Sequence, residues 1–293
     1  MKKIVVLGSL GMAGHMMMAH LRCSNEYEVL GIARRTGKFV DEVLDVTDFS
    51  ILESYLEREM PEYVINCVGA LVSQSDESIS SAILLNSYLP NFLAQIGDRL
   101  NFKLIHISTD CVFSGKHGHY TEVSFRDGDN NYARTKALGE VINDRDVTIR
   151  TSIIGPELKS NGTGLFDFFL KQQGVIQGYT KSLWSGVTTL ELAKEVKYII
   201  EHDICGLYHL TNGKPISKYD LLVLFNKYAN KGVVIEAVDG YVTDKLLIDT
   251  RKELDDTVPD YEVMISEMFS FMKNHSDWYR HYSSMSDNSF ISL

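Results

Sequence analysis

Tyr132 and Lys136 stand four residues apart in the stretch NNYARTKALGE, residues 130–140. In a helix this spacing is about one turn, so both side chains project from the same face. A tyrosine hydroxyl beside a lysine ammonium is a proton donor with a cation that lowers its pKa. An ammonium about 4 Å away contributes roughly 4 kcal/mol at an effective dielectric constant near 20, which lowers a tyrosine pKa by up to about three units. The pair therefore predicts acid–base chemistry near neutral pH.

Spacing alone does not identify the catalytic pair, because Tyr241 and Lys245 repeat it. The residues upstream distinguish the two. Before Tyr132, the apolar run HISTDCVF supplies Ser108 and Thr109 at the expected end of a strand, 23 residues ahead, where a hydroxyl can hold a substrate oxygen. Tyr241 instead follows an Asp–Gly turn signal. We therefore assign Thr109, Tyr132 and Lys136 as the candidate catalytic residues.

The neighbours in the Tyr132 helix have simpler expected roles. Ala133 and Thr135 need only be compact, whereas Arg134 and Glu140 are expected to face solvent.

Three glycines recur every three residues in IVVLGSLGMAGHMMMAHL, at the expected junction of the first strand and first helix. Gly8 suits a tight turn, Gly11 the close approach of a pyrophosphate, and Gly14 close packing of the helix on the strand, with the phosphate at the helix N-terminus. Met12 lies inside this turn and is counted among the cofactor-binding residues. Met16–Met18 are expected to pack in the core. The pattern predicts a dinucleotide-binding site.

The end of the second expected strand, GIARR, indicates which dinucleotide binds. An acidic residue there bonds the ribose 2′-hydroxyl of NAD, but this strand ends without one. Arg34 and Arg35 can clamp a 2′-phosphate, or they form a solvated basic turn. We favour NADP(H), with NAD(H) as the alternative. Asp45 and the adjacent Val46 are further cofactor-binding candidates, although a turn or N-cap role for Asp45 remains open.

Short apolar runs alternate with helical patterns through the first half of the chain. Candidate strands span residues 2–8, 27–33, 63–69, 103–109 and 147–154, and the segment 48–60 between them carries an apolar stripe with Asp48 as a plausible N-cap. This alternation predicts an α/β fold with a Rossmann-type, doubly wound parallel sheet.

The rhythm changes after Gly155–Pro156, which divides the chain into two expected domains. Residues 1–155 form the NAD(P)-binding Rossmann domain, and residues 187–210 are expected to return to its sheet. Residues 156–293 form a smaller C-terminal substrate-binding domain, in which Ser217 is the expected N-cap of a helix. The Ser-rich end is expected to be a loose tail from about residue 282.

Composition excludes several classes of protein. The 293 residues are 44% hydrophobic and carry a net charge of -10, which disfavours nucleic acid and anionic membranes as partners. No window has the roughly 18 consecutive apolar residues of a membrane helix, and Gly8 comes too early for a signal peptide, so we expect a cytoplasmic protein. The four cysteines are widely separated, so neither a metal site nor a disulfide framework is expected.

With these features the chain resembles the extended short-chain dehydrogenase/reductase family, and within it is most similar to dTDP-4-dehydrorhamnose reductases. The stretches that carry the resemblance run from residue 4 to about 210: GSLGMAG, YVINCVGA, ISTDCVFSG, NNYARTKALGE, RTSIIG and GLYHL. The resemblance implies an NAD(P)-dependent oxidoreductase whose second domain closes over a nucleotide sugar. It gives Thr109, Tyr132 and Lys136 the roles of a catalytic triad.

The resemblance also implies roles outside the triad. Val68, Gly69 and Ala70 belong to the cofactor ribose region, and Asn86 helps to order the site. Lys136 also holds the ribose. Asp110, Cys111 and Trp184 are the expected substrate-binding residues, with interdomain packing left open for Trp184.

Two positions depart from the family pattern. Related 4,6-dehydratases carry an acidic residue where this chain has Cys111, so dehydration is disfavoured, and rhamnose-type reductases usually carry tyrosine there. Thr188 stands where the family usually has proline. Both departures leave the identity of the sugar open.

Three functions are therefore weighed. The first is NADPH-dependent reduction of the 4-keto group of a nucleotide-activated deoxysugar, in polysaccharide or glycan precursor synthesis. The second is an epimerase or dehydratase of the same fold. The third is a non-catalytic NADP-binding regulatory partner, like the related regulatory subunit of methionine adenosyltransferase. A homodimer is also open.

Overall fold

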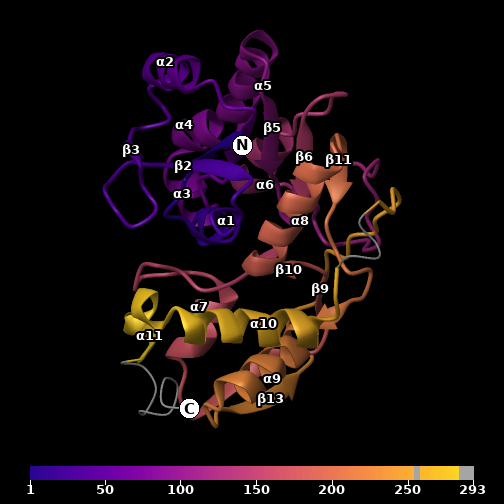
Figure 1. Cartoon of the computed structure of the whole chain (residues 1–293). Helices are drawn as coiled ribbons and strands as arrows, with labels where there is room; N and C mark the ends of the chain where they lie inside the picture. The colour runs from indigo at the N-terminus through magenta and orange to yellow at the C-terminus, as the bar shows by residue number, and fades with distance from the viewer. Residues whose placement is uncertain (254–257, 284–293) are drawn as a thin grey trace.

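The computed structural model describes residues 1–253 and 258–283, which form two parts stacked one above the other in Figure 1. The upper part holds a seven-stranded sheet in the order β11-β6-β5-β4-β1-β2-β3, and every neighbouring pair in it is parallel. This order, with crossover helices on both faces, is the doubly wound Rossmann arrangement. The predicted fold class is confirmed.

The sheet and its helices follow the predicted alternation of short strands and longer helices. The strands of the sheet are β1 (Lys2–Leu7), β2 (Tyr27–Ala33), β3 (Glu42–Val43), β4 (Tyr63–Asn66), β5 (Lys103–Ile107), β6 (Val147–Arg150) and β11 (Gly206–His209). The helices around it are α1 (Met12–Leu21), α2 (Phe49–Glu59), α3 (Val72–Glu77), α4 (Ile79–Ala82), the π-helix η1 (Ile83–Tyr88), α5 (Leu89–Leu100), η2 (Asp110–Val112), α6 (Asn131–Leu138) and α8 (Thr189–Glu201).

Strand β1 shows why the sheet is buried on both faces. Val5 and Leu7 pack in the cluster that includes α2 and α5, whereas Ile4 and Val6 pack in the cluster that includes α1 and α8. All four side chains have no exposed surface. A parallel strand covered on both faces needs an unbroken apolar run, which the sequence KKIVVLG supplies.

The lower part contains short strands and the remaining helices. These are β8 (Val175–Tyr179) paired with β13 (Val234–Val238), the group β12 (Ile216–Ser217), β9 (Ser182–Trp184) and β14 (Thr243–Asp244), the pair β7 (Ile153–Ile154) and β10 (Val187–Thr188), and helices α7 (Leu165–Lys171), α9 (Lys218–Ala229), α10 (Tyr261–Asn274), η3 (Ser276–Trp278) and α11 (Arg280–Ser283). Ser217 caps α9 by accepting a hydrogen bond from Asp220 N, as expected. Asp48 caps α2 through Ile51 N.

The expected strand 147–154 is divided in the structure. It breaks after Arg150, where Thr151 turns its hydroxyl to Leu210 O at 2.9 Å, and it resumes as β7 in a separate two-stranded sheet. The break lets the chain leave the large sheet for the lower part. Further along, β11 pairs with β6 at the edge of the large sheet.

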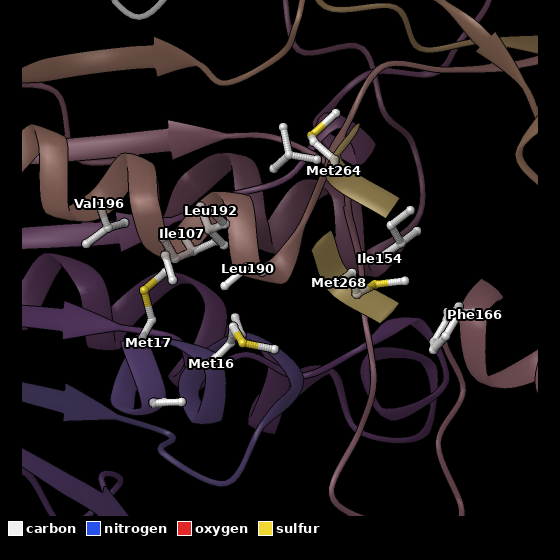
Figure 2. Close-up of a cluster of buried hydrophobic side chains, with 14 of the residues drawn as sticks. Met16, Met17, Ile107, Ile154, Phe166, Leu190, Leu192, Val196, Met264 and Met268 are labelled. Carbon is white, nitrogen blue, oxygen red and sulfur yellow. The ribbon is translucent and has the colours of Figure 1, made fainter. Parts of the chain in front are cut away.

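A continuous apolar cluster joins the two parts. Figure 2 shows Met16 and Met17 of α1 near Leu192 of α8, with Met268 of α10 and Phe166 of α7 in the same cluster. Met16–Met18 have no exposed surface, which confirms their expected place in the core. Flexible methionine side chains suit a junction between elements of different shape.

The C-terminal segment corrects the expected start of the loose tail. Tyr282 in α11 is 6% exposed, and its hydroxyl accepts a hydrogen bond from Glu157 N at 3.0 Å. The chain is therefore docked at residue 282, and the rest of the expected tail, 284–293, lies outside the described residues. Within 1–253 and 258–283, no helix has the length and apolar character needed to cross a membrane.

Candidate active site

Thr109 and Tyr132 meet where β5 ends and α6 begins. Thr109 caps η2, and its Oγ1 accepts a hydrogen bond from Cys111 N at 3.1 Å. Asn130 caps α6 by accepting from Ala133 N at 2.8 Å, which starts the helix just before Tyr132. Tyr132 lies close enough to Thr109 for the threonine side chain to lower its pKa. The structure thus brings together the two hydroxyls that the sequence placed 23 residues apart.

The surroundings of Tyr132 keep its hydroxyl protonated. Burial raises its pKa well above the ordinary value, the charges of Cys111 and Asp110 raise it further, and the Thr109 side chain lowers it. At neutral pH the side chain is therefore an intact phenol. That is the form able to protonate an alkoxide.

Lys136 lies one helical turn after Tyr132 and directs its ammonium toward the end of β5. Its ammonium donates a hydrogen bond to Ile107 O at 2.8 Å and is 4% exposed. Burial lowers its pKa to about 8, against the charges of Glu140 and Cys67, which raise it. Burial acts most strongly on the pKa of Tyr132, followed by Cys111, Thr109 and Asp110. The lowering of that pKa by Lys136 stays a prediction.

Glu140 is buried, which corrects the expectation that it faces solvent. It is 8% exposed and accepts hydrogen bonds from Arg150 Nε at 2.6 Å and from Ser108 Oγ at 2.8 Å. Ser108 is therefore directed into this network, and Thr109 remains the hydroxyl next to Tyr132. Arg134 is exposed, as expected.

The glycine turn is built for close backbone approach. Gly8 has φ of +80°, which favours glycine, and a Cβ added there would lie 3.0 Å from Val68 Cγ2. A Cβ on Gly14 would lie 2.1 Å from Gly8 O, so only glycine lets α1 pack on the turn. Gly11 is the N-cap of α1, so its neighbour Met12 begins the helix. The cradle fits a pyrophosphate at the helix N-terminus.

Asn86 fixes the loop after β4. The side chain is fully buried, accepts a hydrogen bond from Ala70 N at 2.8 Å, and donates to Ala70 O at 3.0 Å and to Thr135 Oγ1 at 3.1 Å. The oxygen and nitrogen of the Asn86 side-chain amide both bind protein groups. The side chain thereby orders the loop of Val68, Gly69 and Ala70. Its place in the π-helix η1 was not evident from the sequence.

Arg34 and Arg35 follow β2 and are exposed. Across residues 1–253 and 258–283, no carboxylate forms an ion pair with either guanidinium. Two exposed cations that form no ion pair in the described residues fit a 2′-phosphate at this strand end. Asp45 lies near Arg34, but its carboxylate accepts hydrogen bonds from Thr47 N at 3.0 Å and Thr47 Oγ1 at 2.7 Å, which is the turn role left open.

The hydrogen bonds of Asp45 also explain its charge state. The backbone hydrogen bond from Thr47 lowers its pKa, burial acts in the opposite direction, and Arg34 adds to the lowering. The next residue, Val46, is buried in the core.

Lys245 is a site residue that the sequence analysis set aside. Its Nζ donates a hydrogen bond to Cys111 Sγ at 3.3 Å, although the pair Tyr241 and Lys245 was rejected as a catalytic motif. Tyr241 is 59% exposed. No local signal reveals Lys245, because β14 brings it to η2 from 134 residues away.

Trp184 lies in the hydrophobic core and not on an open surface. It is 7% exposed, and its ring centroid lies 5.7 Å from that of Tyr261 in α10. This supports packing, the alternative left open, and gives no surface for stacking on a base or sugar.

A cavity of about 390 Å³ opens in the lower part, lined by Leu165, Phe168, Ile176, Gln177, Tyr179, Lys218 and Leu222. Its walls are aromatic and aliphatic, with Lys218 as the one cation. Burial raises the pKa of Asp110, and the charges of Lys245 and Lys218 oppose that rise.

The sheet is doubly wound and has a glycine turn after β1, and Thr109, Tyr132 and Lys136 follow β5. These features together define an extended short-chain dehydrogenase/reductase. The chain belongs to the family described as the RmlD substrate binding domain, whose model matches residues 1–243.

Relatives with assigned activities cover most of the chain. A dTDP-4-keto-6-deoxy-D-glucose reductase of Streptomyces niveus is 26% identical over 231 residues, 74% of this chain and 75% of the relative. The spore coat polysaccharide biosynthesis protein SpsK of Bacillus subtilis is 26% identical over 226 residues, covering 75% and 77%. The crystal structure of dTDP-4-dehydrorhamnose reductase from Bacillus anthracis with NADP is 21% identical, with a TM-score of 0.80, over 93% of this chain and 100% of that one.

A regulatory protein also appears among the relatives. Methionine adenosyltransferase 2 subunit beta of Xenopus laevis is 24% identical over 236 residues, 75% of this chain and 70% of the relative.

Proposed function

We propose that the protein is an NADPH-dependent reductase of the 4-keto group of a nucleotide-activated deoxysugar, acting in the synthesis of a polysaccharide or glycan precursor. The observation that carries this proposal is the protonated Tyr132 hydroxyl beside Thr109 at the end of β5, on the edge of the sheet that also bears the glycine turn. Relatives named as nucleotide-sugar 4-keto reductases support it.

The residues divide the work of this reaction. NADPH, when bound, supplies the hydride. The glycine turn binds the pyrophosphate, Arg34 and Arg35 bind the 2′-phosphate, and Lys136 is the candidate ribose ligand. Tyr132 donates its proton to the oxygen of the reduced carbon, and Thr109 holds that oxygen in place.

The test is consumption of NADPH with 4-keto sugars carrying GDP, dTDP or UDP. We expect turnover with at least one substrate and a loss of about 10²- to 10⁴-fold in Tyr132→Phe, the size of a general-acid contribution. NADPH binding by the variant, measured by fluorescence titration, should remain unchanged. Full activity in Tyr132→Phe would show that another group donates the proton.

Cys111 argues against the dehydratase alternative, because a thiol whose pKa burial raises to about 11 does not remove a proton at neutral pH. An epimerase or dehydratase would keep its nucleotide bound and turn over without added cofactor. A nucleotide spectrum of the purified protein and an assay lacking NADPH therefore separate these functions.

The regulatory alternative is supported by the similarity to methionine adenosyltransferase 2 subunit beta. It requires a stoichiometric partner, captured by the full chain and lost when residues 284–293 are deleted, with no NADPH turnover on any of the sugars. Cytoplasmic location and a homodimer stay predictions; size-exclusion chromatography with light scattering tests the second.

A further inference from the structure

Lys245 reaches the candidate active site from the lower part of the molecule. It follows β14, is partly buried, and donates from Nζ to Cys111 Sγ at 3.3 Å. In the described part of the chain, no carboxylate oxygen lies within the 4.0 Å of an ion pair with this ammonium. The contact between the Lys245 ammonium and the Cys111 thiol is therefore not imposed by an ion pair that holds the lysine in place.

The backbone that carries Lys245 is fixed to the loop that follows η2. Asp244 N donates to Gly115 O at 3.0 Å, and Tyr120 N donates to Leu246 O at 2.8 Å. Gly115 approaches so closely that a Cβ there would lie 3.1 Å from Lys245 Cγ. The stem of the side chain is thus held by the segment that begins with the catalytic residues. This geometry is pre-organised, because no loop has to close to bring Lys245 to Cys111.

Titratable groups from four elements act on one another here. They are Asp110 and Cys111 of η2, Tyr132 of α6, Lys218 of α9, and Tyr241 and Lys245 around β14. Lys245 is the cation among them that contacts the thiol directly. Burial lowers its pKa, but the charges of Cys111 and Asp110 outweigh burial and raise it, so Lys245 is protonated at neutral pH.

We propose that Lys245 is a positioning residue of the catalytic centre, which holds the Cys111 thiol beside Tyr132 and sets a positive charge against the buried Asp110 carboxyl. The catalytic part of this proposal rests on the proposed function of Tyr132; the electrostatic part does not.

The consequence for proton transfer follows from the charges. Cys111 is a neutral thiol at neutral pH because burial raises its pKa to about 11, so Asp110 is the group whose negative charge raises the pKa of Tyr132 and makes it a weaker acid. The Lys245 ammonium acts on the same two groups with the opposite sign. Without it, Tyr132 should give up its proton more slowly.

The first test needs no substrate. Alkylation of Cys111 by iodoacetamide is followed by peptide mass spectrometry from pH 7.5 to 9.5, with the exposed Cys23 as an internal reference. Only the thiolate reacts, so the rate below the thiol pKa reports that pKa. Lys245 lowers the pKa of Cys111, so Lys245→Met should slow the alkylation of Cys111, by about tenfold for each unit that the thiol pKa rises.

Matched variants separate charge from structure. Lys245→Arg should react like the wild-type protein, and so should Lys181→Met, which removes an exposed lysine paired with Asp239. If Lys245→Met does not fold, Lys245→Gln replaces it. The proposal is overturned if folded Lys245→Met or Lys245→Gln alkylates Cys111 as fast as the wild-type protein, or faster. A lysine with only a structural role would leave the alkylation rate unchanged, or its loss would speed the reaction by exposing the thiol.

The second test is the pH profile of reduction. Lys245→Met should lower kcat by about tenfold and leave the KM for NADPH unchanged. Lys245→Arg, which keeps the positive charge, should retain most of the wild-type kcat. A wild-type protein inactive on every sugar defeats the proposed function but leaves the alkylation result standing. An active wild type with an unaltered kcat profile in Lys245→Met defeats the role of Lys245 in proton transfer alone.

Discussion

Tyr132 meets a requirement that depends on the direction of the reaction. Reduction of a ketone ends with a proton on the new hydroxyl, so the donor must be protonated at working pH. Burial and the neighbours Cys111 and Asp110 raise the pKa of Tyr132, which keeps the phenol intact. The reverse oxidation needs a phenolate, and this environment opposes one. The protonated form that reduction requires is therefore the one present at working pH.

Arg34 and Arg35 carry the prediction about cofactor choice. Each charge-assisted hydrogen bond to a phosphate contributes about 1.5–3 kcal/mol, so the loss of one should raise the KM for NADPH by about 10- to 100-fold, and replacing both arginines with serine should raise it at least that much. The KM for NADH, which lacks the 2′-phosphate, should change little. Steady-state kinetics with both cofactors measures this. Arg134→Ser, at an exposed position of α6, is the control.

An equal rise in both KM values would show instead that Arg34 and Arg35 support the fold of the loop. That result would remove the reason to prefer NADP(H) over NAD(H) as the cofactor.

Helix α1 contains a buried histidine that links the glycine turn to the C-terminal segment. His15 Nδ1 lies 2.9 Å from Gly11 O, and its Nε2 lies 2.9 Å from the Tyr279 hydroxyl. Burial lowers its pKa to about 4, with weaker contributions from Gly11 and Glu157 that raise it. The ring is therefore neutral in the folded protein at physiological pH.

This histidine predicts a loss of stability in acid. The unfolded chain binds a proton at His15 below pH about 6.5, whereas the folded chain resists it down to about 4, so stability is complete above 6.5 and falls as the pH drops through that window. The loss at pH 5 is about 2 kcal/mol from this residue. His15→Gln should reduce the difference in unfolding free energy between pH 7 and pH 5 by about that amount, measured by urea denaturation.

The control for this prediction is His202→Gln, at an exposed position after α8. It should leave the pH dependence as it is in the wild-type protein. If His15→Gln also leaves it unchanged, the acid sensitivity belongs to other buried histidines such as His106 and His209.

Elements with a strong local pattern were predictable from the sequence. The glycine turn, the strands with unbroken apolar runs and the caps Asp48 and Ser217 all follow from short-range rules. The burial of Glu140 depends on Arg150 in β6, and that of Trp184 on Tyr261 in α10. Because these partners lie in other elements, local patterns placed Glu140 wrongly and left Trp184 open. Lys245 was not predicted as a site residue, because backbone contacts between two loops far apart in the sequence bring it to Cys111.

At the scale of the whole molecule, the C-terminal segment ties the lower part to the cofactor turn. Trp278 of η3 lies edge-on to Phe39, with ring centroids 5.1 Å apart, and the Lys38 ammonium lies 4.1 Å from the Trp278 ring. Next to it, Tyr279 contacts His15. Both contacts reach the segments that carry the candidate cofactor residues, because Lys38 follows Arg35 and His15 follows Gly14. Cofactor binding and the docking of α10–α11 should therefore be coupled.

Trp278→Ala tests this coupling without touching the candidate active site. An edge-to-face ring pair contributes about 0.5–1.5 kcal/mol and a partly exposed cation–π contact about 0.5–1 kcal/mol, so the variant should loosen the loop after β2. Since only part of that energy reaches the cofactor, we expect the Kd for NADPH to rise about three- to tenfold, by fluorescence titration. Phe125→Ala, which removes a ring that is 86% exposed, should leave the Kd unaltered. The coupling is refuted if Trp278→Ala lowers the melting temperature but binds NADPH as tightly as the wild-type protein, because the C-terminal segment would then stabilise the fold independently of the cofactor loop.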